Sequence, residues 1–133
     1  MQVQILGIDE AIAKLDAIDQ NLRHADEPMR QATLIVAGAA KHNAPVDTGV
    51  LRASIMPDVE SRDNATTGVV GSNIVYAPAM ELGTRPHFPP LAALQTWARR
   101  HGMTAYVVAR AIARRGLRAR RYLGRALDDN QAR

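Results

Sequence analysis

Cysteine is absent from all 133 positions, which excludes disulfides and thiolate metal sites and gives no information on the redox compartment. Aromatic residues are few: Trp97, Phe88 and three tyrosines make up 4% of a chain that is 47% hydrophobic. Small aliphatic side chains must therefore fill a light core. No stretch approaches the roughly 20 apolar residues of a membrane span, and the N-terminus has no basic segment followed by an apolar run, so no secretion signal is expected. We expect one domain over residues 1–133, made in the cytoplasm.

Lysine is also scarce, with two residues against fifteen arginines. Residues 1–84 hold six Lys and Arg against eleven Asp and Glu, a net charge of −5, whereas residues 85–133 hold eleven Arg against two Asp, a net charge of +9. Arginine favours paired contacts with carboxylate or phosphate groups. Such a polarised molecule can stack acidic end against basic end. The alternative is a solvated basic face without a dedicated partner.

Hydrophobic periodicity predicts an α+β fold, in which about four to five helices pack on one face of a small antiparallel β-sheet. The acidic part holds helices and a β-hairpin, and the Arg-rich part is helical. Helices are expected over residues 8–22, 26–43, 91–101, 104–115 and 118–129, and strands over residues 2–6, 54–60 and 66–76.

Local signals refine these elements. Asp26 is expected to cap the second helix, Thr104 is expected to cap the fourth, and Gly116 is expected to end it. The run 34–40 is apolar all round, which predicts a buried helix. Gly38 within it would allow another backbone to approach closely, at a cost of ~1 kcal/mol in helix propensity.

Two compact motifs carry the strongest signal. The first spans residues 44–55 (APVDTGVLRASI) and the second spans residues 76–86 (YAPAMELGTRP). Proline, glycine and small polar residues stand between apolar positions in both, which predicts two ordered turns. The residues that define them are Pro45, Asp47, Thr48, Gly49, Leu51, Arg52 and Ser54 in the first motif and Tyr76, Glu81, Gly83 and Thr84 in the second.

These turns allow two interpretations. In the structural one, Asp47 and Thr48 bind backbone N–H groups and Gly49 supplies a conformation that other residues resist. In the functional one, Glu81 pairs with Arg52 or Arg85 and shapes a subunit contact. The structural interpretation is favoured, because buried turns must satisfy their polar groups in any protein.

Together with residues 112–117 (IARRGL), the two motifs resemble the tail-completion, or head–tail joining, family of long-tailed bacteriophages, the minor tail protein Z-like group. The resemblance covers nearly the whole chain. It implies a structural virion protein of the neck or tail that joins the completed tail to the DNA-filled head. The implied partners are the tail terminator, the head–tail connector or stopper, and further copies of this chain around the DNA channel.

Five arginines recur at three- and four-residue steps, namely Arg110, Arg114, Arg118, Arg121 and Arg125. Several share one basic face if the last two helices are nearly continuous. That face could meet phage DNA, an acidic protein surface, or solvent alone. Protein contact is preferred, because DNA that must slide is poorly served by many tight Arg–phosphate bonds. The rival function is a small basic DNA-binding or DNA-packaging accessory protein, suggested by the pI near 10.1.

No residue pattern indicates catalysis or a cofactor. Ser54, Asp47 and His42 contain the elements of a catalytic triad, but no nucleophile elbow surrounds the serine. His42, His87 and His101 could bind a metal with Asp47 or Glu81, yet no pair of histidines has metal-ligand spacing. We therefore expect a protein that is not an enzyme and holds no metal.

Overall fold

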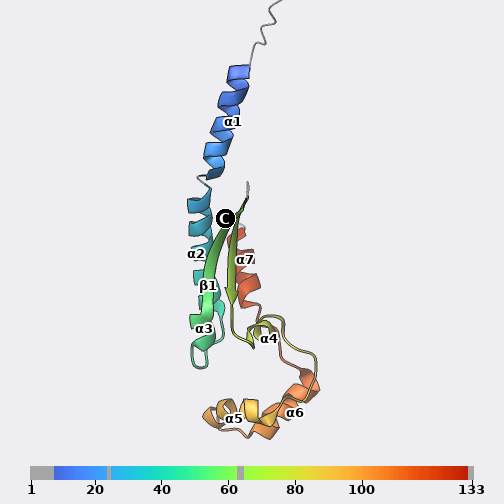
Figure 1. Ribbon diagram of the computed structural model, residues 1–133. Helices are drawn as coiled ribbons and strands as arrows, with labels where there is room; N and C mark the ends of the chain where they lie inside the picture. The colour runs from blue at the N-terminus through green and yellow to red at the C-terminus, as the bar shows by residue number, and fades with distance from the viewer. Residues whose placement is uncertain (1–7, 24, 63–64, 132–133) are drawn as a thin grey trace, which may run out of the picture.

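The computed structural model describes residues 8–23, 25–62 and 65–131 (Figure 1). Its elements follow the order α1 (Ile8–Arg23), α2 (Asp26–Asn43), α3 (Val50–Ser54), β1 (Ile55–Arg62), β2 (Ala65–Ser72), α4 (Ala77–Leu82), α5 (Leu91–Arg100), α6 (Ala105–Arg115) and α7 (Tyr122–Gln131). The predicted α+β class is confirmed. The short helices α3 and α4 raise the helix count above the expected four to five, and the strand expected at residues 2–6 lies outside the described residues.

The molecule is elongated, with three parts along its length (Figure 1). In the middle, α2 packs against both strands of the hairpin and against α7. Helix α1 stands clear of this body at one end, and α5 and α6 pack together at the other end. We call α5 and α6 the basic lobe, because their charged residues are all arginines. Within the described residues, no helix combines the length and apolar character needed to cross a membrane.

The core lies where α2, the hairpin and α7 meet. Its buried members are mostly small, as the scarcity of aromatics predicts, and Tyr122 and Ile55 are its largest fully buried side chains. Burial raises the pKa of the Tyr122 phenol, and the nearby charges of Glu81 and then Tyr76 raise it further. The phenol hydroxyl has no hydrogen-bond partner among the described residues.

The hairpin pairs antiparallel from Ile55 with Ser72 to Arg62 with Ala65. Its far end is fastened to the start of α2 by Asp26, whose Oδ1 accepts hydrogen bonds from Ser61 Oγ at 2.6 Å and Thr66 Oγ1 at 2.7 Å. The prediction that Asp26 caps α2 is therefore wrong. The carboxylate finds two hydroxyl donors on the hairpin, and Ala25 occupies the N-cap without a side-chain hydrogen bond.

The two hydrogen bonds that Asp26 accepts from the hairpin, which we call the Asp26 clamp, make the free energy of unfolding depend on pH. The hydrogen bonds from Ser61 and then Thr66 lower the pKa of the Asp26 carboxyl, against a smaller opposing effect of desolvation. The stabilisation that the ionised Asp26 carboxylate gives the folded state is complete above the pKa of an unfolded aspartate, near pH 4. It is lost as the pH falls through the lower pKa of the folded state. We expect the melting temperature difference between the wild type and Asp26→Asn to shrink as the pH falls from 5 to 2. A difference that stays constant in thermal melts over this range would contradict the clamp.

Helix α2 has the predicted bounds but not the predicted burial. Thr33, Ala37 and Ala40 are buried, whereas Leu34 and Ile35 are exposed, so the expectation of an all-round buried helix is wrong. The reason is that the hairpin and α7 cover only one side of α2. Nothing approaches Gly38 either, since a Cβ built there would meet no atom within 4 Å.

The open space at Gly38 leads to a prediction. Gly38→Ala should raise the free energy of unfolding by about 0.5–1 kcal/mol, because alanine loses less backbone entropy in a helix and clashes with nothing here. Urea denaturation of the two proteins measures this difference. A loss of stability would mean that another backbone does lie against this glycine.

Helices α6 and α7 are separate. Helix α6 ends at Gly116, whose φ of 69° stops the helix as predicted, and α7 begins only at Tyr122. The helix expected over 118–129 therefore starts four residues late. Residues 116–121, which we call the connector, are bound to the second motif instead of continuing a helix.

Candidate functional site

The second motif and the connector are joined through their backbones. Thr84 and Leu117 form an antiparallel bridge, in which Thr84 N donates to Leu117 O at 3.0 Å and Leu117 N donates to Thr84 O at 3.2 Å. Further along, Arg120 N donates to Met80 O at 2.9 Å and Arg121 N donates to Glu81 O at 3.0 Å. The Arg-rich part of the chain is thereby fixed to the turn that follows the hairpin.

Glu81 completes this junction with its side chain. Its carboxylate accepts from Leu123 N and from Gly124 N, each at 2.9 Å. These are backbone N–H groups in the first turn of α7, which have no intrahelical partner and carry the positive end of the helix dipole. Glu81 therefore caps α7, and the suggested pairing with Arg52 or Arg85 is not what the structure shows.

Glycines on both sides make the bridge possible. Gly83 has φ 73° and ψ −178°, and Gly116 has φ 69° and ψ −166°. This backbone region is essentially restricted to glycine. Each glycine also lies against backbone of the other segment, so a Cβ at either position would collide with it.

The first motif forms one wall of a hollow of about 310 Å³. We call it the motif hollow, and it unites both motifs with the C-terminal half of the chain. Its lining includes Pro45, Val46, Asp47, Thr48, Gly49 and Leu51 from the first motif, Tyr76 and Met80 from the second, and Trp97, His101 and Arg120 from the Arg-rich part. A second hollow of about 350 Å³ between α2, β2 and α7 has a mainly apolar lining and contains none of the motif residues.

Asp47 holds the two halves of the motif hollow together. Its Oδ2 lies 2.6 Å from Arg100 Nη2, and its Oδ1 lies 3.3 Å from His101 Nε2. The His101 ring also packs on Trp97, with ring centroids 4.2 Å apart. The expectation that Asp47 binds backbone N–H groups of its own turn is thus wrong, because Arg100 at the end of α5 and His101 at its C-cap engage both carboxylate oxygens. Thr48 is exposed.

Gly49 does have the predicted special conformation, with φ 81° at the start of α3. Leu51 from the same motif is buried in the core. Ser54 Oγ donates to Leu51 O at 2.7 Å and lies 2.7 Å from Ser72 Oγ. The motif therefore closes a turn and ties it to β2 through Ser54, and of the structural interpretation only the Gly49 part matches the structure.

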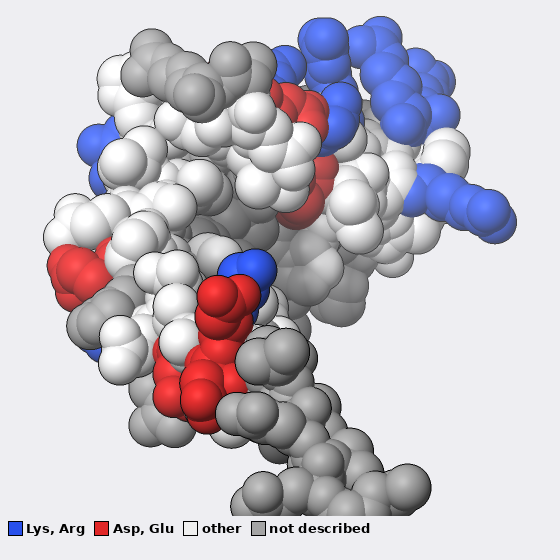
Figure 2. Space-filling model, turned by 90° about the horizontal axis from the view of Figure 1, so that it is seen from above, with Lys and Arg blue, Asp and Glu red and all other residues white. Residues whose placement is uncertain are grey.

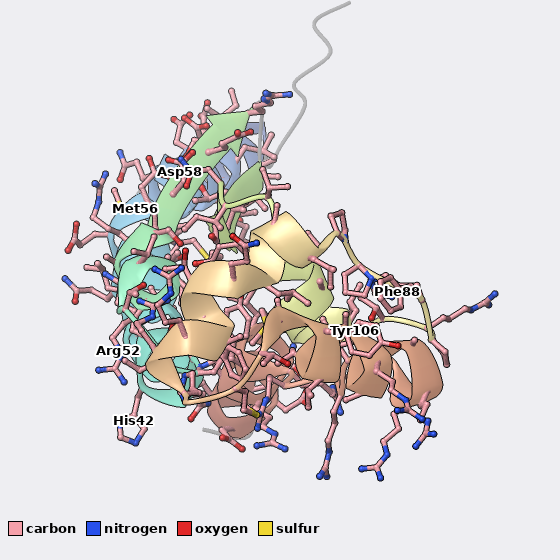
Figure 3. All side chains as sticks on the ribbon, turned by 90° about the horizontal axis from the view of Figure 1, so that it is seen from below. His42, Arg52, Met56, Asp58, Phe88 and Tyr106 are labelled. Atoms are coloured by element: carbon pink, nitrogen blue, oxygen red, sulfur yellow. The ribbon has the colours of Figure 1, made fainter. Side chains whose placement is uncertain are left out.

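The candidate catalytic triad does not assemble. Ser54 is engaged with Leu51 and Ser72, Asp47 is engaged with α5, and His42 is exposed and points outward (Figure 3). Arg52 points outward at the same edge. Across the described ranges, no group of three or more histidine, aspartate or glutamate residues is placed to hold a metal ion.

The five spaced arginines do not share one helical face. Arg110 and Arg114 lie on α6, Arg118 and Arg121 lie in the connector, and Arg125 lies on α7. All five are exposed, and Arg121 bridges Asp128 at 3.4 Å. Figure 2 shows Lys and Arg side chains gathered at one side of the molecule, with a large acidic group away from them. A basic surface exists, but the connector breaks the continuous helix on which the predicted face depends.

Sequence reasoning missed Trp97, Arg100 and Arg120 as parts of the site, and it considered His101 beside Asp47 only as a metal ligand. Asp47 is separated from Arg100 by 53 residues, and no local pattern reports such a contact. The one signal in the sequence was that Trp97, the sole tryptophan, stands close to Arg100 and His101 at the end of an expected helix.

In this small protein the residues of the two motifs line a surface hollow and stabilise turns. A family model described as "Bacteriophage HK97-gp10, putative tail-component" matches residues 9–83, which is more than half of the chain. The searches of curated proteins and of solved structures return no match. The chain therefore belongs to this HK97-gp10-like family of bacteriophage tail components, as the resemblance of its motifs indicated.

Membership in this family assigns the chain to the structural proteins of the phage. A tail component has its place in the virion and contacts other phage structural proteins there. This class agrees with the expectation that the protein is not an enzyme. The match ends at Gly83, one residue before the bridge to the connector, so the basic lobe and α7 lie outside the matched range.

Proposed function

We propose that this protein joins the completed tail to the DNA-filled head, with several copies arranged around the DNA channel in the neck. Its partners are the tail terminator on one side and the head–tail connector or stopper on the other. The whole chain acts as one unit, because residues 116–121 of this chain and the Glu81 carboxylate bind the Arg-rich part to the motif-bearing part. Assembly takes place in the host cytoplasm before the particle is released.

The observation that carries this proposal is the composition of the motif hollow. It exposes apolar Val46 and half-exposed Tyr76 beside the Asp47–Arg100 ion pair. Apolar and aromatic groups next to fixed charges are the features with which proteins recognise other proteins. Residues of both motifs line the hollow, so a partner that binds there contacts the part of the chain that is characteristic of the family.

The rival function, a DNA-binding or DNA-packaging accessory protein, draws support from the exposed arginines. Binding to phosphates by several arginines would make the affinity for duplex DNA fall steeply with salt. Binding that is weak at low salt and shows little salt dependence would favour the joining role. Electrophoretic mobility shifts of a random duplex at 50 and 200 mM salt distinguish the two.

Disruption of this gene alone in its phage tests the joining role. Negative-stain microscopy should show filled heads beside loose, full-length tails. Normal virions would refute the proposal. Empty proheads would also refute it and would support the packaging role.

A single charge placed in the motif hollow should abolish joining without unfolding the protein. Val46 is 56% exposed and lines the hollow, whereas Val69 is 47% exposed and lies on β2. We expect Val46→Asp to lower the plaque titre of the disrupted phage, complemented in trans, by about 100-fold, because it buries a charge against the partner. The matched variant Val69→Lys, whose charge is opposite to that of its cross-strand neighbour Asp58, should complement like the wild type. Equal titres for the two variants would exclude the hollow as the contact.

A further inference from the structure

Helix α1 presents an apolar stripe that the rest of the chain does not cover. Ile12, Leu15 and Ile18 are 50%, 65% and 54% exposed. They recur every three residues, which places them along one side of the helix. In Figure 1, α1 stands clear of the hairpin and α7. A stripe of this kind on a charged helix marks an interaction surface.

Two aspartates flank the apolar stripe of α1. Asp9 and Asp16 lie two helical turns apart, about 10 Å along the axis, on the side of the helix that also carries Ile12. Neither makes an ion pair or a hydrogen bond to any residue in the described part of the chain. The arm formed by α1 therefore needs a partner surface that is apolar and basic together.

Such a surface lies on α6, in the basic lobe. Arg110 and Arg114 stand one turn apart in a row with Tyr106, and Val107 lies beside that row. Tyr106 and Val107 are 57% and 55% exposed. Arg110 and Arg114 have no ionic partner within the described ranges. Phe88 packs on Tyr106, with ring centroids 6.3 Å apart, and extends the apolar area outward (Figure 3).

These two surfaces cannot meet within one molecule. The α2–hairpin–α7 body separates them, so α1 and the basic lobe lie at opposite ends (Figure 1). We propose that α1 of one copy packs on the exposed face of α6 of a second copy, with Ile12, Leu15 and Ile18 against Tyr106 and Val107. Asp9 and Asp16 of the arm then pair with Arg110 and Arg114 of the neighbour.

Charge complementarity favours α6 of a second copy, and not α1 of a second copy, as the partner of the α1 stripe. In an antiparallel pair of α1 helices the same flank of each helix faces its counterpart, which would bring the two aspartate rows together. The α6 face offers the opposite charge. The contact is also heterologous, because it joins different surfaces of two identical chains. Repetition of such a contact produces a ring if the rotation closes. The inference thus rests on the proposed function, since it supplies the contact that arranges copies around a channel.

Charge exchange in the full-length protein tests the pairing. Sedimentation velocity at tens of micromolar should show self-association of the wild type. Asp16→Arg alone and Arg110→Glu alone should each weaken it about ten-fold, and the chain with both changes should regain most of it, because the opposite charges are restored. The matched change Asp58→Arg, on the exposed β1 strand, should have no effect. A monomeric wild type, or a double variant no better than the single ones, would overturn the inference.

Cysteine crosslinking locates the contact, since the natural chain has no cysteine to interfere. A mixture of Leu15→Cys and Val107→Cys, each with a different tag, should form mixed disulfide dimers in excess of either homodimer. Predominance of Leu15→Cys homodimers would overturn the inference in favour of α1 pairing with α1. Either negative result leaves the joining role to stand on the gene disruption, which reads out joined particles independently of this contact.

Discussion

Gly83→Ala and Gly116→Ala should each lower the free energy of unfolding by about 3 kcal/mol or more, because the new methyl group meets strain and collision together. At Gly83 the added Cβ would meet the carbonyl oxygen of Leu117 and would lie 2.7 Å from Ala119 N. At Gly116 it would meet the carbonyl oxygen of Thr84 and would lie 2.9 Å from the Arg85 carbonyl carbon. These are backbone atoms, so no side-chain rotation can relieve the clash.

Gly102→Ala provides the matched control. Gly102 has φ 68°, like the other two glycines, but a Cβ there would meet nothing within 4 Å. It should cost only about 1–2 kcal/mol, the penalty of a left-handed conformation alone. The double variant Gly83→Ala with Gly116→Ala should cost little more than one change, since both break the same bridge. Urea denaturation followed by fluorescence of Trp97 compares these four variants with the wild type, and equal losses at Gly83 and Gly102 would contradict the account.

Glu81→Ala should cost about 3 kcal/mol, because two backbone N–H groups at the start of α7 lose a charged acceptor. The loss should spread beyond the cap. Tyr122, the first residue of α7, is the largest fully buried side chain in the described part of the chain, so a frayed first turn would loosen the core.

Glu81→Gln separates charge from shape. Its amide oxygen can accept one of the two hydrogen bonds without charge, and we expect it to cost about half as much as Glu81→Ala. Glu60→Ala is the matched surface control, since among the described residues the Glu60 carboxylate makes only an exposed bridge of 3.3 Å to Arg62, and it should change stability by less than about 0.5 kcal/mol. Chemical denaturation of the three variants tests this order, and a harmless Glu81→Ala would rule out the capping role.

The sequence predicted the elements whose causes are local. Helix α2 has the expected bounds 26–43, because Pro28 falls in its first turn and no further proline follows until Pro45 ends it. Thr104 caps α6 as expected, accepting a hydrogen bond from Val107 N, and Gly49 has the expected left-handed backbone. In each case the decisive interaction spans only a few residues.

The wrong predictions concern residues whose structure is determined by contacts with residues distant in the sequence. Residues 118–121 are three arginines and an alanine, good helix formers, yet hydrogen bonds to Met80 and Glu81 hold this stretch out of the helix. Likewise, Asp26 and Asp47 were expected to cap nearby turns and instead bind partners 35 to 54 residues away. Nothing in the local pattern distinguishes these aspartates from ordinary capping residues.

The most direct test of the joining role is reconstitution. Filled heads and free tails from the gene-disrupted phage are mixed with the purified full-length protein, and infectious particles are counted. The account predicts that the wild-type protein raises the titre by orders of magnitude above the mixture without it, and that Val46→Asp does not. No rise with folded wild-type protein, in a mixture whose heads and tails join when wild-type extract is added, would contradict the proposal that this protein joins them.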